Sequence, residues 1–278
     1  MAIITLTRGT YSGAKELAEY TAKNLGYTLL SREDLIGELA HLGWEENKLN
    51  AARYRRLGIM ERMNLQWIHY LACLRAVLAE KAKGEALVYH GNQGHVVLRD
   101  FPHVLSIKCI ADMEYRIQAV MARNEYAIDR KEALRIINRI DQKRERWSKF
   151  LYGADPNDVT AYSMVIDLSK KSIPDAFEMI HSQISLPQFQ PTPESKKAIE
   201  ELALAARLRA KVAMECEIID DDLEVEIKDG IVNIKGTVHS VEDAHQIRRF
   251  LAKQPEIHDV EAHLEETREE ASDAVHGH

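Results

Sequence analysis

The stretch IITLTRGTYSGAKELA, residues 3–18, decides the fold of this chain. A short apolar run leads into a loop rich in Gly and Ser, and the loop leads into an amphipathic helix. This order directs backbone N–H groups and the positive end of a helix at one spot, where an anion is stabilised. The stretch therefore predicts a phosphate-binding loop, with the N–H groups of residues 11–15 as donors and Arg8 or Lys15 as the cation.

The loop departs from the common phosphate-loop pattern G-x-x-x-x-G-K-[ST]. Gly9 and Gly13 stand one position too close together, and Ala14 occupies the place of the lysine. Lys15 falls on the hydroxyl-bearing position that normally holds Mg²⁺, where a cation would repel the metal or partly replace it. The alternative is a strand–turn–helix corner that binds nothing, with glycines needed only for the turn.

Length and composition limit the class of protein. The chain has 278 residues, 45% of them hydrophobic, and a net charge of −7. This balance argues against bulk electrostatic binding of nucleic acid. Three scattered cysteines indicate neither a disulfide framework nor a metal site, so a reducing, cytoplasmic location is expected. We see no secretory signal and no apolar run near the ~20 residues of a membrane span, so we expect no integral membrane protein.

Short β-type runs alternate with helical patterns up to about residue 185. This alternation predicts an α/β fold, with a mostly parallel sheet between flanking helices. A Ser172–Asp175 capping arrangement is expected to begin the last helix of this part. The predicted strands are residues 3–6, 86–90, 104–109 and 164–168, and the predicted helices are residues 14–25, 32–40, 61–83, 112–123, 130–150 and 174–183.

A second, smaller part follows residues 186–195, LPQFQPTPES, whose three prolines predict a semi-rigid, non-helical linker. A helix is expected from residue 196 to about 213, then a hairpin of residues 223–228 and 231–236 around the turn dipeptide Asp229-Gly230. A helix over 241–253 and a strand over 258–264 complete an α+β module. The predicted domains are therefore 1–185 and 196–265, with an acidic tail at 266–278.

Residues 130–149 form a basic helical stretch, with eight Lys or Arg against three acids. Arginines of such a helix can close over transferring phosphates, because guanidinium groups are always charged and bind phosphate oxygens in pairs. A solvated helix face is the alternative. Aromatic residues are not interleaved with the cations, so we expect no nucleic-acid partner.

The first part resembles the cytidylate-kinase-like family, a branch of the P-loop nucleoside monophosphate kinases, over residues 1–185. The resemblance rests on blocks in the same order: residues 7–18, which match that branch's modified phosphate loop; 26–27 with 31–35; 88–94; Arg116; 140–146; 152–155; and 162 with 165–167. It implies a P-loop kinase fold that binds ATP and Mg²⁺ and phosphorylates a nucleoside monophosphate or another small acceptor.

The same resemblance suggests roles for individual residues. Lys15, Arg144 and Arg146 would be catalytic, and Arg116 would bind the acceptor. In the turn of residues 91–94, Asn92-Gln93 replaces the family's arginine, which costs one charge-assisted contact. The donor nucleotide would be bound by Arg8, Gly9, Ser12, Gly13, Ala14 and Lys15.

Three other candidate residues each have two possible roles. Arg32 and Asp34 would contact the acceptor, or would cap the helix that begins there. Asp155 would orient the acceptor, or would form an Asx turn next to Pro156. His90 and His95, which flank the turn of residues 91–94, are interpreted as surface or hydrogen-bonded residues rather than ligands.

The second part resembles a BON domain over about residues 197–265, on the strength of its helix, its hairpin with closing Gly236, and its last strand. The resemblance implies binding of a phospholipid, another small ligand or a protein partner. Three functions follow as alternatives for the whole chain. It is a kinase, a non-catalytic nucleotide sensor whose BON-like part binds a ligand, or an interaction protein whose loop binds nothing.

Overall fold

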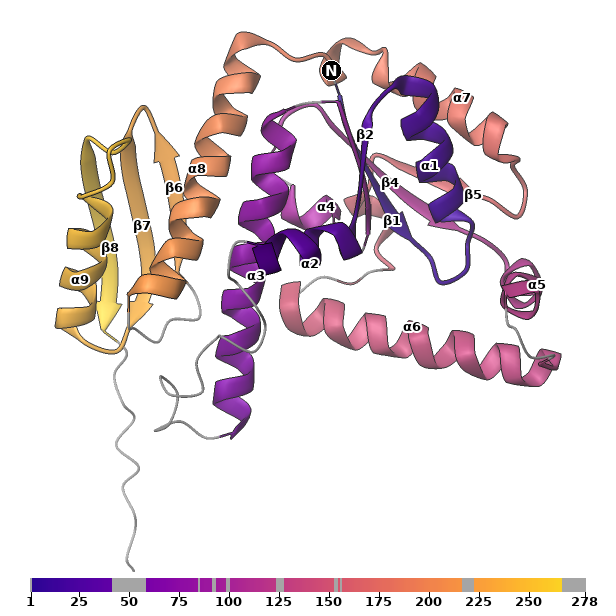
Figure 1. The fold of residues 1–278 in the computed structure, drawn as a ribbon, viewed down its shortest axis with the longest axis horizontal. Coiled ribbons are helices and arrows are strands. Elements are labelled where there is room, and N and C mark those ends of the chain that lie inside the picture. The colour runs from indigo at the N-terminus through magenta and orange to yellow at the C-terminus, as the bar shows by residue number, and fades with distance from the viewer. Residues whose placement is uncertain are drawn as a thin grey trace, which may run out of the picture. The chain divides into compact units, whose positions relative to one another are not determined.

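The structure is a computed structural model, and it describes residues 2–41, 59–84, 86–91, 94–98, 101–123, 128–152, 155, 157–216 and 223–266. The chain divides into two compact units (Figure 1). The first unit contains residues 1–43 and 77–200, and the second contains residues 44–76 and 201–278. The long helix α3 (Ile59–Lys83) contributes residues to both.

The first unit is built on a five-stranded parallel sheet in the order β2-β3-β1-β4-β5. Every strand pair is parallel, so the carboxyl ends of all the strands meet at one edge. This edge carries the loop of residues 9–13, which follows β1. The strands are β1 (Ile3–Arg8), β2 (Thr28–Ser31), β3 (Leu87–Gly91), β4 (Val104–Ile110) and β5 (Met164–Asp167).

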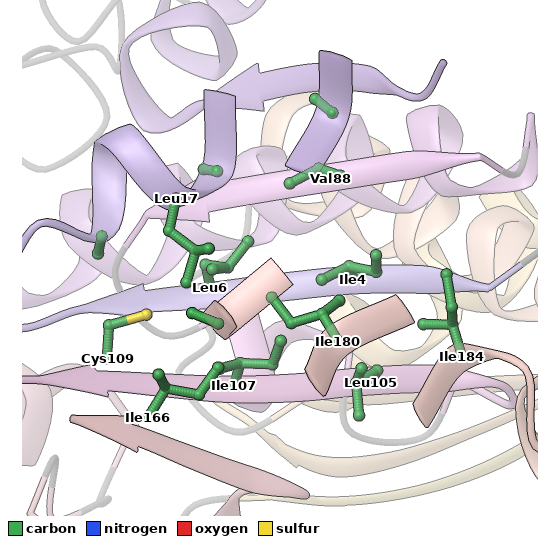
Figure 2. Packing of buried hydrophobic residues seen from close by; sticks show 14 of the residues in the cluster. Ile4, Leu6, Leu17, Val88, Leu105, Ile107, Cys109, Ile166, Ile180 and Ile184 are labelled. Atoms are coloured by element: carbon green, nitrogen blue, oxygen red, sulfur yellow. The ribbon is translucent and has the colours of Figure 1, made fainter. Parts of the chain in front are cut away.

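One face of this sheet is covered by α1 (Ala14–Leu25) and α7 (Ile173–Ile184), as Figure 2 shows. Ile4 and Leu6 of β1 pack there against Leu17 and Ile180. Side chains alternate between faces along a strand, so Thr5 and Thr7 lie on the opposite face. There Thr7 Oγ1 is 3.4 Å from His95 Nδ1 of the short helix α4 (Gly94–Val97).

A helical hairpin, α5 (Met113–Arg123) and α6 (Arg130–Tyr152), has a small core of its own. Ile117 and Val120 of α5 pack against Ala133 and Ile137 of α6, and all four are buried. Tyr11 of the loop after β1 packs against the same cluster. The core of the hairpin therefore includes the loop.

All strands and helices predicted for the first part are present, with their ends shifted by one or two residues at most. The Ser172 cap is confirmed, since its hydroxyl accepts a hydrogen bond from the Asp175 amide at 3.3 Å. Strand β2 was not among the predicted strands. Its four residues include only Leu29 and Leu30 as apolar residues, and just one of these is buried, which leaves too short a pattern to detect.

In the second unit, the described residues from 201 onward form a three-stranded sheet that shares one core with α9 and most of α8. Its sheet has the order β6-β7-β8, antiparallel between β6 and β7 and parallel between β7 and β8. The predicted hairpin is confirmed, with both Asp229 (φ 51°) and Gly230 (φ 77°) in the left-handed region that a tight turn requires. The elements are α8 (Pro193–Glu215), β6 (Glu224–Lys228), β7 (Ile231–Val238), α9 (Val241–Leu251) and β8 (Asp259–Glu266).

The prediction of a non-helical linker at 186–195 was wrong at two places. Residues Pro187–Phe189 form a 3-10 turn, and α8 already begins at Pro193. Proline is tolerated in the first turn of a helix, where its missing N–H has no partner to lose. Phe189 is buried in the core of the first unit. The predicted acidic tail starts at Glu266, the last residue of β8, and the rest of it lies outside the described residues.

The described part of the chain contains no helix that is both long enough and apolar enough to cross a membrane.

Candidate functional site

The loop after β1 is tied to the neighbouring strand by its first glycine. The Gly9 amide donates to the Cys109 carbonyl at 3.0 Å, and the Gly9 carbonyl accepts from the Ser12 hydroxyl at 3.1 Å. A Cβ at Gly9 would lie 2.8 Å from the Cys109 carbonyl oxygen. Backbone on that side cannot move aside cheaply, so position 9 needs a glycine.

Gly13 begins α1 in a left-handed conformation, with φ 81°, and provides no side-chain cap. The N–H groups in the first turn of a helix have no partner within the helix. At α1 these are the amides of Ala14, Lys15 and Glu16. Of the amides of residues 11–15 that the sequence predicts as phosphate donors, that of Ser12 donates instead to the Gly9 carbonyl at 3.3 Å, whereas those of Ala14 and Lys15 lie in the first turn of α1 at the carboxyl edge of the sheet.

Arg144 of α6 reaches this loop from far along the sequence. Its guanidinium donates to Thr10 Oγ1 at 2.9 Å and to the Arg8 carbonyl at 3.3 Å. Among the described residues it forms no ion pair. Burial, and next the neighbouring Arg8 cation, lowers the pKa of Arg144 to about 10, so the group is still charged at neutral pH. The charge of Asp141 acts in the opposite direction, but a cation that is largely removed from water and forms no ion pair still favours an anion at this place.

Arg116 of α5 binds the backbone of Thr10, the residue whose side chain Arg144 contacts. Its Nε donates to the Thr10 carbonyl at 2.7 Å, and its terminal nitrogen donates to Asp141 of α6 at 2.6 Å. The Arg116 side chain is only 14% exposed. Thr10 itself is 3% exposed. Two arginines from two helices therefore fix this one residue of the loop.

Helical spacing explains why Arg144 faces the loop. Ala133 and Ile137 pack toward α5, and Asp141 and Arg144 continue the same stripe of α6 at steps of three or four residues. Arg146 is two residues further on, more than half a turn away, and is exposed. The structure brings Arg144 to the loop and does not bring Arg146 there.

The loop has a further tie to α5 through Tyr11, which adopts a left-handed conformation with φ 56°. The guanidinium of Arg123 lies 5.9 Å from the centre of the Tyr11 ring. Arg123 also forms an ion pair with Glu16 of α1. These contacts were not predicted from the sequence, because they depend on how α5 is placed against α1.

Arg8 and Lys15 were both predicted as cations for the phosphates, and the structure places them differently. Arg8 is mostly buried and donates to Glu33 at 3.1 Å. Lys15 is 66% exposed and its ammonium lies 3.7 Å from Glu19, one turn further along α1. The cations that surround the loop here are thus arginines.

The residues predicted to contact the acceptor substrate lie in a helix cap or in a turn. Asp34 forms a capping box with Ser31: its carboxylate accepts from the Ser31 amide at 2.8 Å, and its own amide donates to the Ser31 hydroxyl at 3.0 Å. Hydrogen bonds from the Ser31 side chain and amide lower the pKa of Asp34. Arg32 is the first residue of this helix, α2 (Arg32–His41). Asp155 accepts from the Asn157 amide at 2.9 Å, the Asx turn that the sequence offered as an alternative.

His90 was interpreted from the sequence as a surface or hydrogen-bonded residue. It is 3% exposed, and its Nε2 has no hydrogen-bond partner among the residues that the structure describes. The burial contradicts the surface interpretation. The other residues of that predicted turn, Asn92 and Gln93, lie outside the described residues.

Comparisons with known proteins agree with this architecture. The profile of the cytidylate kinase-like family matches residues 3–170. A crystal structure of an uncharacterized protein from Eubacterium ventriosum ATCC 27560 is similar at 21% identity and a TM-score of 0.51, covering 66% of this chain and 99% of that one. That similarity indicates a shared fold. No curated protein matches.

Two other solved structures are less similar to this chain, and we draw no conclusion from them. Shikimate kinase from Bacteroides thetaiotaomicron is 13% identical with a TM-score of 0.40, covering 66% of this chain and 99% of that one. Thymidylate kinase from Candida albicans is 12% identical with a TM-score of 0.36, covering 66% of this chain and 91% of that one.

Proposed function

The chain belongs to the cytidylate kinase-like family, and from this premise we propose that its first unit binds ATP and transfers the γ-phosphoryl group to a nucleoside monophosphate. The observation that carries the proposal is Arg144, a largely buried guanidinium that touches the loop and forms no ion pair among the described residues, with Asp141 acting on it only through its charge. A polyphosphate at the loop would supply the missing negative charge.

Each part of the site has one task in this reaction. The free amides at the start of α1 bind donor phosphate oxygens, and Arg144 neutralises charge that develops on the transferred group. Arg116 keeps Thr10, and hence the loop, in place. An oxygen of the acceptor phosphate attacks the γ-phosphorus, the bond to the bridging oxygen breaks, and ADP leaves with the electron pair.

Lys15, Arg146, Arg32, Asp34 and Asp155 remain proposed site residues. Lys15 and Arg146 are exposed cations that could reach the phosphates only after α6 or their own side chains rearrange. The carboxylates of Asp34 and Asp155 are already hydrogen-bonded to nearby residues, so contact with an acceptor would have to add to those bonds or replace them.

The residues do not fit a Mg²⁺ ion held by protein side chains. Nowhere in the described part of the chain do three or more His, Cys, Asp or Glu side chains gather as they would around a metal. The hydroxyl of Ser12 is bonded to Gly9, and Lys15 stands where a hydroxyl is usual. Mg²⁺ that arrives with ATP would be held by phosphates and water, and no step above depends on a protein ligand for it.

A non-catalytic nucleotide sensor is the second candidate, and the position of Lys15 favours it. With this lysine directed at Glu19, the first unit can bind phosphates through amides and arginines yet lack a cation next to the leaving oxygen. In that case the second unit would carry the output.

We propose that residues 196–265 are a BON-like module that binds a protein or a small ligand. Its strand, hairpin and helix order fits the resemblance. The solvent-facing side of its sheet is rich in carboxylates, which opposes anionic phospholipid headgroups. These are Glu224, Glu226, Asp259, Glu261 and Glu265, against Lys228 and Lys235. The buried free cysteines agree with a cytoplasmic location, which is part of the proposal.

Two measurements test these functions. Isothermal titration with ATP and with CMP, each with and without Mg²⁺, should show binding of both nucleotides; no binding of either would exclude the kinase and the sensor. A coupled assay of ADP release across nucleoside monophosphates then separates the two. Release that depends on an acceptor supports the kinase, and binding without release supports the sensor.

A further inference from the structure

The inference concerns His90, which lies where the first sheet changes the direction of its connections. Helix α1 follows β1 on one face of the sheet, and α4 follows the neighbouring strand β3 on the other face. In open parallel sheets a ligand crevice forms outside the carboxyl ends of two such strands. His90 is the last residue but one of β3, and Arg8 is the last residue of β1.

The register places the two side chains on the same face. Along β1 and β3, His90 is opposite Leu6, and on its other side it is opposite Ser31 of β2. Val88 and Leu6 belong to the core under α1. His90 and Arg8 each follow one of these by two residues, so both lie on the face of α1, at the carboxyl edge.

The imidazole of His90 is buried, and its Nε2 has no hydrogen-bond partner in the part of the chain that the structure describes. Leaving a buried polar atom without a partner costs about 1–3 kcal/mol, and such atoms are uncommon in native proteins. Burial, and next the nearby Arg8 cation, lowers the pKa of His90 to about 4. The other charges near it are Glu33, Lys15 and Glu16. At neutral pH the ring is therefore uncharged.

An uncharged ring among cations is suited to an uncharged ligand group. Arg144 is the proposed cation for phosphates, and Arg8 opposes protonation of the ring. A neutral imidazole has one N–H donor and one nitrogen acceptor, which match a hydroxyl or a base edge.

We propose that His90 recognises the acceptor of the kinase reaction, through a hydrogen bond between Nε2 and an uncharged polar group of the nucleoside. This inference rests on the proposed function, because it takes the acceptor to be a nucleoside monophosphate. It assigns specificity to a residue of β3, and phosphate binding to the arginines.

The test compares the wild-type chain with His90→Leu and His90→Gln, using CMP and ATP as probes. Leucine has a similar size and no polar atom, so His90→Leu should melt at the same temperature as wild type or higher. Its affinity for CMP should nevertheless fall by roughly tenfold or more, while ATP affinity changes less than about twofold. His90→Gln restores a hydrogen-bonding end and should recover part of the CMP affinity.

A matched control is His181→Leu on α7, which removes an imidazole from the same unit away from the carboxyl edge. It should leave CMP affinity unchanged. If wild type binds neither CMP nor ATP, the proposed function falls and the role of His90 falls with it. If wild type binds CMP and both His90 variants bind it equally well, the role of His90 alone is overturned. If His90→Leu does not fold, the CMP affinity of His90→Gln decides.

Discussion

Three exposed ion pairs of the second unit can be compared with two shielded arginines of the first. In the second unit, the ion pairs Arg207–Glu256, Lys235–Glu224 and Arg249–Glu242 all join side chains that are more than 40% exposed. In the first unit, Arg116 and Arg144 are largely shielded from water and donate hydrogen bonds to Thr10 of a loop, and Arg116 also pairs with Asp141. Exposed pairs contribute little to stability, whereas shielded charges are costly. Arg144 therefore differs from the three exposed cations, because it contacts a loop and forms no ion pair among the described residues.

The largest expected effect concerns the pH dependence that His90 gives to the first unit. Its folded pKa of about 4 lies below its ordinary value of 6.5, so below pH 6.5 the unfolded chain binds the proton more readily. The free energy of unfolding should therefore decrease as the pH falls from about 6.5 to 4, by up to ~3 kcal/mol. Chemical denaturation at several pH values should show this decrease in wild type and a smaller one in His90→Leu. Equal slopes for the two proteins would contradict it.

The next effect concerns Arg144 and its counterpart Arg249. Hydrogen bonds to charged groups are worth about 1.5–3 kcal/mol, so Arg144→Ala should weaken ATP binding roughly 10- to 100-fold. Arg249→Ala removes a guanidinium whose partner Glu242 is exposed, and should leave ATP binding unchanged. Titration calorimetry on both variants checks this. A loss of affinity of the same size in both would remove the distinction between the units.

Two glycines sharpen the comparison at the level of the backbone. Gly9→Ala brings a methyl group to within 2.8 Å of the Cys109 carbonyl, and the clash should cost about 1–3 kcal/mol and displace the loop. At Gly230 a methyl group would meet the side chain of His258, which can turn away, but φ is 77°. Gly230→Ala should therefore cost about 1 kcal/mol. Thermal melts give both costs, and ATP titration should detect the loop shift in Gly9→Ala alone.

The smallest effect is expected for the exposed ion pairs of the second unit. Glu242→Gln should change the free energy of unfolding by less than about 0.5 kcal/mol, since water screens the pair. Denaturant titration in low and in high salt provides the measurement. A change above about 1 kcal/mol would mean that this pair is more than a surface contact.

Much of the fold follows from local pattern. Helix α1 was predicted at both ends, because an amphipathic repeat lies between Gly13 and Gly26, each of which adopts the left-handed conformation of a helix boundary. The hairpin around Asp229-Gly230 followed from its turn dipeptide. By contrast, β2 was missed, since only one side of its short run is apolar and buried.

The site was harder to predict, because its geometry depends on contacts between distant segments. The sequence offered Arg144 and Arg146 equally, and only the packing of α6 against α5 decides which of them faces the loop. The burial of His90 likewise arises from its two neighbouring strands. A sequence signal did exist for Asp34, since Ser31-x-x-Asp34 is a capping pattern that the hydrogen bonds confirm.

The hold of Arg116 and Arg144 on Thr10 has a thermodynamic consequence. A loop that is fixed by bonds to two helices has lost its conformational entropy during folding, so a ligand that docks onto it need not order it again. The structure thus describes a preorganised receptor, for which affinity depends on contacts rather than on induced ordering. Loosening that hold at Asp141, which touches no ligand in this scheme, would transfer the entropic penalty to the binding step.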